Sequence, residues 1–169
     1  KVLEFERNQD GLHLLHSGQF GTWRKLWTIA EATADSVTFA LDLPDGEGGF
    51  PGNRRVTARF TVLPPATLRM EIEGTTDAPT LMNFANHSYW NLDGTADWTG
   101  HRLRIAADRY LPTTDSAAPT GEIRPVAGGG HDLREGPVLR KGDPPIDHNF
   151  CLSDGPRPLR EVLWLSGAS

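Results

Sequence analysis

The segment 83–92, NFANHSYWNL, gathers polar side chains around one histidine. Asparagines precede His87, and Ser88, Tyr89 and Asn91 follow it. In a strand that packs a core, each such group would cost about 1–3 kcal/mol unless it found a hydrogen-bond partner. We therefore expect these residues to meet something polar. Imidazole titrates near neutral pH, so His87 can donate a proton to an oxygen or accept one from it.

Two further positions carry related chemistry. His16 lies beside a glycine in LHSGQF, and Asp147 precedes His148 in PPIDHNF. Carboxylate, amide and imidazole groups exchange hydrogen bonds with neutral hydroxyls, while Tyr89 and Trp90 offer flat apolar faces. This mixture suits a sugar, whose ring has hydroxyl edges and apolar C–H faces. Structural roles stay open as alternatives, namely a histidine buried for packing or an aspartate that caps a turn.

Other kinds of site lack their sequence signals. The chain has neither a helical HExxH motif nor paired CxxC motifs, and His13 and His16 lie between glycines without a helix signal. Cys151 lies in an apolar, strand-like setting that favours an inert thiol. No GxSxG motif occurs, and the glycine-rich segment 45–53, DGEGGFPGN, lacks the Lys-Ser/Thr ending of a phosphate loop. We expect no metal ion and no cofactor.

The composition limits the partners. The chain has 169 residues, 37% of them hydrophobic, which is enough for the core of one domain over 1–169. A net charge of -5 without blocks of like charge argues against a nucleic-acid or membrane surface. No apolar run reaches the roughly 20 residues that span a bilayer, and a single cysteine cannot form an intramolecular disulfide. We expect a cytoplasmic protein that binds a small molecule.

Short strands must position these residues, because 18 glycines and 13 prolines divide the chain into short elements. The segment 56–72 predicts a β-hairpin with one buried face, since apolar residues alternate on both sides of a Pro-Pro turn. Similar runs predict strands at 36–43, 101–111 and 161–165, and no window has a clear helical period. The pattern predicts an all-β fold of antiparallel sheets, either a sandwich or a barrel.

Five segments, taken in order, resemble the aldose 1-epimerases, also called galactose mutarotases. These segments are LHSGQFGTWRKLW (15–27), DGEGGFPGN (45–53), NFANHSYWNL (83–92), YLPTTDSAAPTGEIRPV (110–126) followed by an HDLR element, and IDHNFCL (146–152). One such motif alone would be weak. Together they follow the family's order with matching spacings over nearly the whole chain, which is specific.

The resemblance implies a β-supersandwich, in which antiparallel sheets pack face to face. It also implies cofactor-free interconversion of the α and β anomers of an aldohexose such as galactose or glucose. By position, His87 matches the family's general acid toward the ring oxygen. His16 and Asp147 match residues that contact the sugar, and Ser88 and Tyr89 adjoin the acid and shape the pocket. On this interpretation, the polar segment around His87 meets the hydroxyls of a monosaccharide.

The sequence also departs from the family pattern. Ser17 replaces the first glycine of the usual Leu-His-Gly-Gly element, and His13 stands where an asparagine is usual. The resemblance places the general base, a glutamate, after residue 169, and a sugar-contacting Asn-Arg element before Lys1. We therefore expect 1–169 to be the central part of a longer chain, without its N-terminal and C-terminal strands.

Alternative functions stay open at this point. One is a sugar-binding domain of the same fold that has lost the base and does not catalyse. Another is a relative of the hexose-phosphate epimerases, which would need basic side chains near the pocket. The candidates for that role are Arg24, Lys25, Arg54 and Arg55. The preferred aldose and the choice between a monomer and a homodimer are also open.

Overall fold

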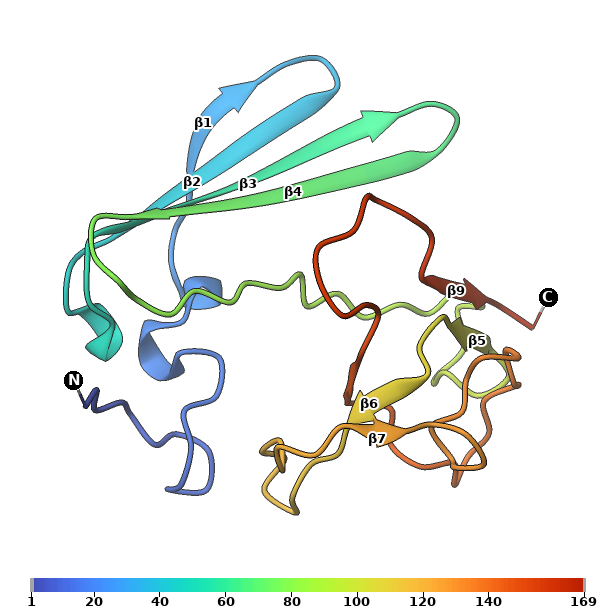
Figure 1. The fold of residues 1–169 in the computed structure, drawn as a ribbon. Helices are drawn as coiled ribbons and strands as arrows, with labels where there is room; N and C mark the ends of the chain where they lie inside the picture. The colour runs from blue at the N-terminus through green and yellow to red at the C-terminus, as the bar shows by residue number, and fades with distance from the viewer. Residues whose placement is uncertain (1, 169) are drawn as a thin grey trace. The chain divides into compact units, whose positions relative to one another are not determined.

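Antiparallel strands joined by turns and short 3-10 helices form the protein in a computed structural model that describes residues 2–168 (Figure 1). The strands are β1 (Thr28–Ala32), β2 (Ser36–Leu43), β3 (Arg54–Leu63), β4 (Thr67–Thr76), β5 (Arg102–Ile105), β6 (Arg109–Leu111), β7 (Arg124–Pro125), β8 (Asn149–Phe150) and β9 (Leu163–Ser166). The 3-10 helices are η1 (Gly18–Phe20), η2 (Thr22–Arg24) and η3 (Glu47–Gly49). Within residues 2–168 there is no α-helix, and the predicted all-β class is confirmed.

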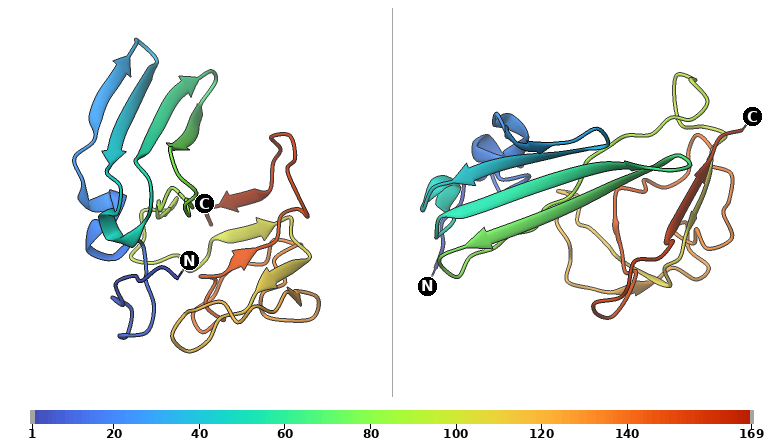
Figure 2. Two further views of the ribbon diagram at one scale, coloured as in Figure 1. Left: turned by 60° about the vertical axis from the view of Figure 1, so that its left-hand side comes forward. Right: turned by 90° about the horizontal axis from the view of Figure 1, so that it is seen from above.

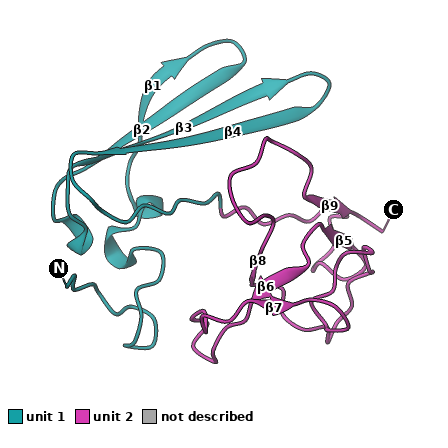
Figure 3. Ribbon diagram, in the orientation of Figure 1, with its two compact units in different colours: residues 1–86 teal, residues 87–169 magenta. Residues whose placement is uncertain are grey.

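The chain divides into two compact units, Lys1–Asn86 and His87–Ser169, which are coloured separately in Figure 3. The first unit holds β1 to β4, and the second holds β5 to β9. The single domain expected over 1–169 stays a prediction.

The first unit contains an antiparallel sheet in the order β1-β2-β3-β4 (Figure 2). In the β3–β4 hairpin, Ala58 is opposite Ile72 and Val62 is opposite Leu68. This is the register that the apolar alternation requires, because facing apolar residues then share one side of the sheet. The predicted hairpin is confirmed, as is the predicted strand at 36–43.

The buried face of this sheet is shorter than predicted. Val56 is 0% exposed and packs with Leu41 and Leu43, whereas Val62 and Leu68 are 62% and 61% exposed. Trp27 and Phe84 pack against the buried residues. The tips of the hairpins lie at the end of the sheet away from the 3-10 helices (Figure 2). The expected buried face is therefore right at one end of the hairpin and wrong at the other.

The second unit contains two small antiparallel sheets, one of β5 with β9 and one in the order β7-β6-β8. The single strand expected over 101–111 is wrong, because this segment contributes β5 to one sheet and β6 to the other. The Ala106 N–H still bonds to the Val162 carbonyl, but the Asp108 carbonyl accepts from the Val126 N–H. The chain changes partners between these residues. The strand expected at 161–165 is present as β9.

Candidate functional site

The segment around His87 has no regular secondary structure and lies at the surface. His87, Ser88 and Tyr89 are all exposed, and Tyr89 is 89% exposed. The rings of His87 and Tyr89 stack with their centroids 5.2 Å apart and their planes 29° apart. The expectation that these residues meet something polar stays a prediction. Their exposed side chains are accessible to a ligand.

A buried histidine anchors the end of this segment. His101 is 1% exposed, and its Nε2 accepts a hydrogen bond of 2.9 Å from the Leu92 N–H. Its Nδ1 lies 3.0 Å from the carbonyl oxygen of Trp98, which can only accept, so Nδ1 carries the proton. Both oxygens of the neighbouring Asp93 carboxylate share one bifurcated hydrogen bond from the Ala168 N–H. This network fixes the chain five residues after His87.

His16 lies in a left-handed turn of the first unit. The φ angles of His16, Ser17 and Gly18 are 51°, 59° and 56°. Non-glycine residues reach this region at a cost of roughly 1–2 kcal/mol each. The family's usual glycine would avoid this cost at Ser17. The side chain of His16 is exposed, as a residue that contacts a ligand must be.

Two side chains from the preceding segment hold this turn. The Asn8 side chain accepts a hydrogen bond of 2.9 Å from the Leu15 N–H and donates one of 3.0 Å to the Leu15 carbonyl. The Glu6 carboxylate accepts a hydrogen bond of 2.9 Å from the Gln19 N–H and packs against Gly18. Both contacts bracket His16. Sequence reasoning missed Asn8 and Glu6, although an asparagine shortly before a turn is a signal for this kind of backbone mimicry.

The side chains of Arg54 and Lys25 hold the glycine-rich segment 45–53 in place. The buried Arg54 guanidinium donates to the carbonyls of Pro44, Glu47 and Gly52 at 3.0, 3.1 and 3.2 Å. Burial lowers the pKa of Arg54, and the negative charge of Glu47 opposes this shift. Lys25 forms a half-buried ion pair of 2.5 Å with Glu47. These bonds make the segment a rigid turn.

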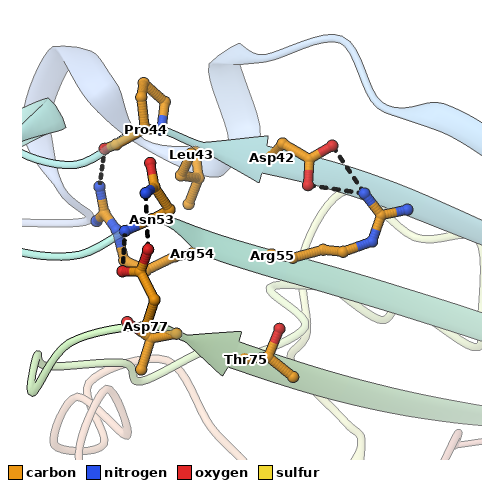
Figure 4. A pocket seen from close by; sticks show the side chains of 9 residues that line it. Asp42, Leu43, Pro44, Asn53, Arg54, Arg55, Thr75 and Asp77 are labelled. Carbon is orange, nitrogen blue, oxygen red and sulfur yellow. Dashed lines mark hydrogen bonds and ion pairs between the residues drawn. The ribbon is translucent and has the colours of Figure 1, made fainter.

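A depression of about 500 Å³ opens beside this turn (Figure 4). On one side, Arg55 donates to both carboxylate oxygens of Asp42 at 2.7 Å. On the other, Asp77 accepts from the Asn53 N–H and the Asn53 amide at 2.7 Å, and these bonds lower the pKa of Asp77. Arg55 is thus paired with a carboxylate, and Arg54 donates to backbone carbonyls. The depression is therefore a weak candidate for a phosphate site.

Asp147 is exposed in the loop before β8, and its neighbour His148 joins an aromatic cluster. The ring of His148 meets those of Tyr110 and His131 with centroids 5.6 and 4.4 Å away. Burial lowers the pKa of His148, the positive form of His131 adds to this, and Asp147 opposes it. In the described part of the chain, the buried Nδ1 of His148 has no hydrogen-bond partner. A neutral His148 thus supports the loop that carries Asp147.

The predicted site residues divide between the units. His87, Ser88, Tyr89 and Asp147 belong to the second unit, and His16 belongs to the first. Their convergence on one face stays a prediction. Among residues 2–168, no three His, Cys, Asp or Glu side chains gather closely enough to hold a metal ion. No helix within the same residues is long and apolar enough to cross a membrane.

Comparison with known proteins gives a consistent result. The family model described as aldose 1-epimerase matches residues 1–166. The chain is 35% identical over 130 residues to the aldose 1-epimerase of Escherichia coli K12, with 76% of this chain and 38% of that protein covered. It is 38% identical over 147 residues to the galactose mutarotase of Rattus norvegicus, with 83% and 42% covered.

A solved structure agrees with this result. The crystal structure of galactose 1-epimerase from Lactobacillus acidophilus NCFM has a TM-score of 0.83 and 26% identity, with 99% of this chain and 52% of that chain covered. The likeness confirms the predicted mutarotase-like fold of antiparallel sheets. The chain spans about 38–42% of the length of the two curated relatives.

Proposed function

Because the chain belongs to the aldose 1-epimerase family, we propose that the protein interconverts the α and β anomers of an aldohexose such as galactose or glucose. The observation that carries this proposal is the family match over residues 1–166. Since the chain spans less than half of the curated relatives, the activity is proposed for the whole protein.

The proposed reaction needs one proton donor and one proton acceptor. His87 donates a proton to the ring oxygen while a base removes the proton of the anomeric hydroxyl, so the bond between C1 and the ring oxygen breaks and C1 becomes a carbonyl. After C1 rotates, the hydroxyl attacks its other face and the protons return. No bond of the carbon skeleton changes, so acid/base groups suffice. We assign the base to a glutamate outside residues 1–169.

The sugar contacts in this proposal come from His16, Asp147, Ser88 and Tyr89. The stacked rings of His87 and Tyr89 support it, since they place an apolar face beside the acid. The exposure of His16 and Asp147 also supports it, because both side chains are accessible to hydroxyls. The proposed partner is a monosaccharide, with neither nucleic acid nor membrane involved. We further propose a cytoplasmic monomer or homodimer.

Polarimetry of freshly dissolved α-galactose or α-glucose tests the proposal. The His87→Gln variant should slow anomer exchange by roughly 10²–10⁴-fold, the usual contribution of a general acid. His13→Gln is the matched control, because it changes another exposed histidine outside the proposed site. A loss of less than about threefold in His87→Gln would remove His87 from the acid role.

The alternative functions make different predictions. A non-catalytic sugar-binding domain would bind galactose without accelerating anomer exchange in the whole protein. A hexose-phosphate epimerase needs basic side chains that are available to a phosphate. Three of the four candidates are engaged within the chain, because Lys25 and Arg55 are paired with carboxylates and Arg54 donates to carbonyls. The fourth, Arg24, lies over the Trp23 ring. The aldose reaction therefore has the better support.

A further inference from the structure

Trp23 is an exposed indole in the same turn region as His16. It lies in η2 of the first unit and is 70% exposed. A large aromatic side chain loses favourable burial when it faces water, and indole is one of the groups that proteins use to bind ligands with mixed polar and apolar surfaces. Trp23 is therefore a candidate ligand-binding side chain.

The edge of the Trp23 ring and the backbone of His16 meet at Gly21, which is buried. A methyl group on Gly21 would lie 2.4 Å from Nε1 of Trp23 and 2.5 Å from the carbonyl oxygen of His16. Both groups thus approach a space that only glycine leaves open. The indole is in this way linked to the position of His16.

One face of the indole is also occupied. The guanidinium of Arg24 lies over the Trp23 ring, 5.2 Å from its centroid, in a cation–π contact. Gly21 at the edge and Arg24 over one face limit the orientations of the ring. A ring that is already ordered loses little conformational entropy when a ligand stacks on its open face.

We propose that Trp23 is a sugar-stacking platform, whose open face packs on the apolar C–H face of the aldose that contacts His16. This inference rests on the proposed function, because it takes the substrate from there. The indole transfers no proton and contacts the sugar equally in the ground state and the transition state. Its loss should therefore raise KM and leave kcat unchanged.

Steady-state kinetics of the whole protein with galactose test the platform. Trp23→Ala should raise KM about 3- to 10-fold, the range of an aromatic stacking contact. Trp23→Phe keeps a smaller ring and should lie between Trp23→Ala and the unmodified protein. Trp164→Phe is the matched control, since Arg104 lies over the Trp164 ring 4.3 Å from its centroid and Trp164 is not among the proposed sugar contacts. An unchanged KM in Trp23→Ala, or a fall in kcat alone, would overturn the platform.

A binding measurement separates this inference from catalysis. In isotope-labelled protein, the indole N–H signal of Trp23 is identified by its loss in Trp23→Phe and followed by NMR during a galactose titration. We expect this signal to shift to saturation and the Trp164 signal to stay fixed. A fixed Trp23 signal in a protein that accelerates mutarotation would reject the platform and keep the proposed function. A shifting signal without mutarotation would keep the platform and reject the catalysis.

Discussion

Replacement of His101 should show how strongly the segment after His87 depends on its anchor. His101→Ala removes an almost fully buried ring together with both of its backbone contacts. His101→Asn is the more informative variant, because its amide nitrogen can take the place of Nδ1 and still donate to the Trp98 carbonyl. Its side chain is too short to replace Nε2 as the acceptor for the Leu92 N–H.

The expected loss in the free energy of unfolding follows from the backbone groups that lose their hydrogen-bond partner when His101 is replaced. An unsatisfied buried N–H or C=O costs about 1–3 kcal/mol, and the half-buried bonds here favour the lower end. A cavity in place of the ring adds to this cost. We expect His101→Ala to lower the free energy of unfolding by about 2–4 kcal/mol and His101→Asn by about 1–2 kcal/mol.

Urea denaturation followed by tryptophan fluorescence measures both variants. His13→Ala is the control, since that histidine is exposed and should change the free energy of unfolding little. A loss below about 0.5 kcal/mol for His101→Ala would refute the anchor, because an exposed surface residue would give the same result. Equal losses for the Ala and Asn variants would instead assign the whole effect to the Leu92 contact.

Three further outcomes are expected. Ser17→Gly should raise the free energy of unfolding by about 0.5–1 kcal/mol in urea denaturation, because it relieves a left-handed φ. The control Ser166→Gly in β9 should instead lower the free energy of unfolding. Changes of the same sign in the two variants would contradict backbone strain at Ser17. The pKa of His148 is lowered in the folded state, so the unfolded chain binds more protons than the folded chain. The free energy of unfolding should therefore fall as the pH drops below the ordinary histidine value of 6.5. Urea midpoints measured across this pH range should change less with pH in His148→Asn. In polarimetry, the isolated 169-residue chain should exchange anomers at a rate close to that of buffer alone, because Glu47 and Glu122 are paired with cations. A turnover of about 10 per second or more would show that a base lies within the chain.

Local alternation predicts those elements whose partners are close in the sequence. The β3–β4 hairpin and β2 follow directly from apolar residues at every second position. The break between β5 and β6 does not, because Ala-Ala-Asp carries no turn signal and the exchange of partners depends on β9, more than 50 residues away. Strands as short as β7 and β8 have too few residues for a period to be detected.

The chemistry of the candidate site stays a prediction, and its supporting residues were not predicted. The residue types around His87 indicated acid/base work on a hydroxylated ligand, and the order of the motifs indicated the family. The sequence did not show whether these polar groups meet other protein groups or a ligand. His101 lies between Gly100 and Arg102, and nothing in that local sequence separates it from an exposed histidine.

The proposed functional residues lie on irregular segments because a strand is a poor support for them. A strand directs neighbouring side chains to opposite faces, so His87, Ser88 and Tyr89 could not all be exposed within one side of a packed sheet. Outside the strands, the backbone must find its hydrogen bonds elsewhere. Asn8 and Glu6 supply them around His16, and His101 supplies them after His87. In each unit, side chains thus provide the backbone hydrogen bonds that neighbouring strands provide within a sheet. The nearby imidazole stays accessible to a ligand.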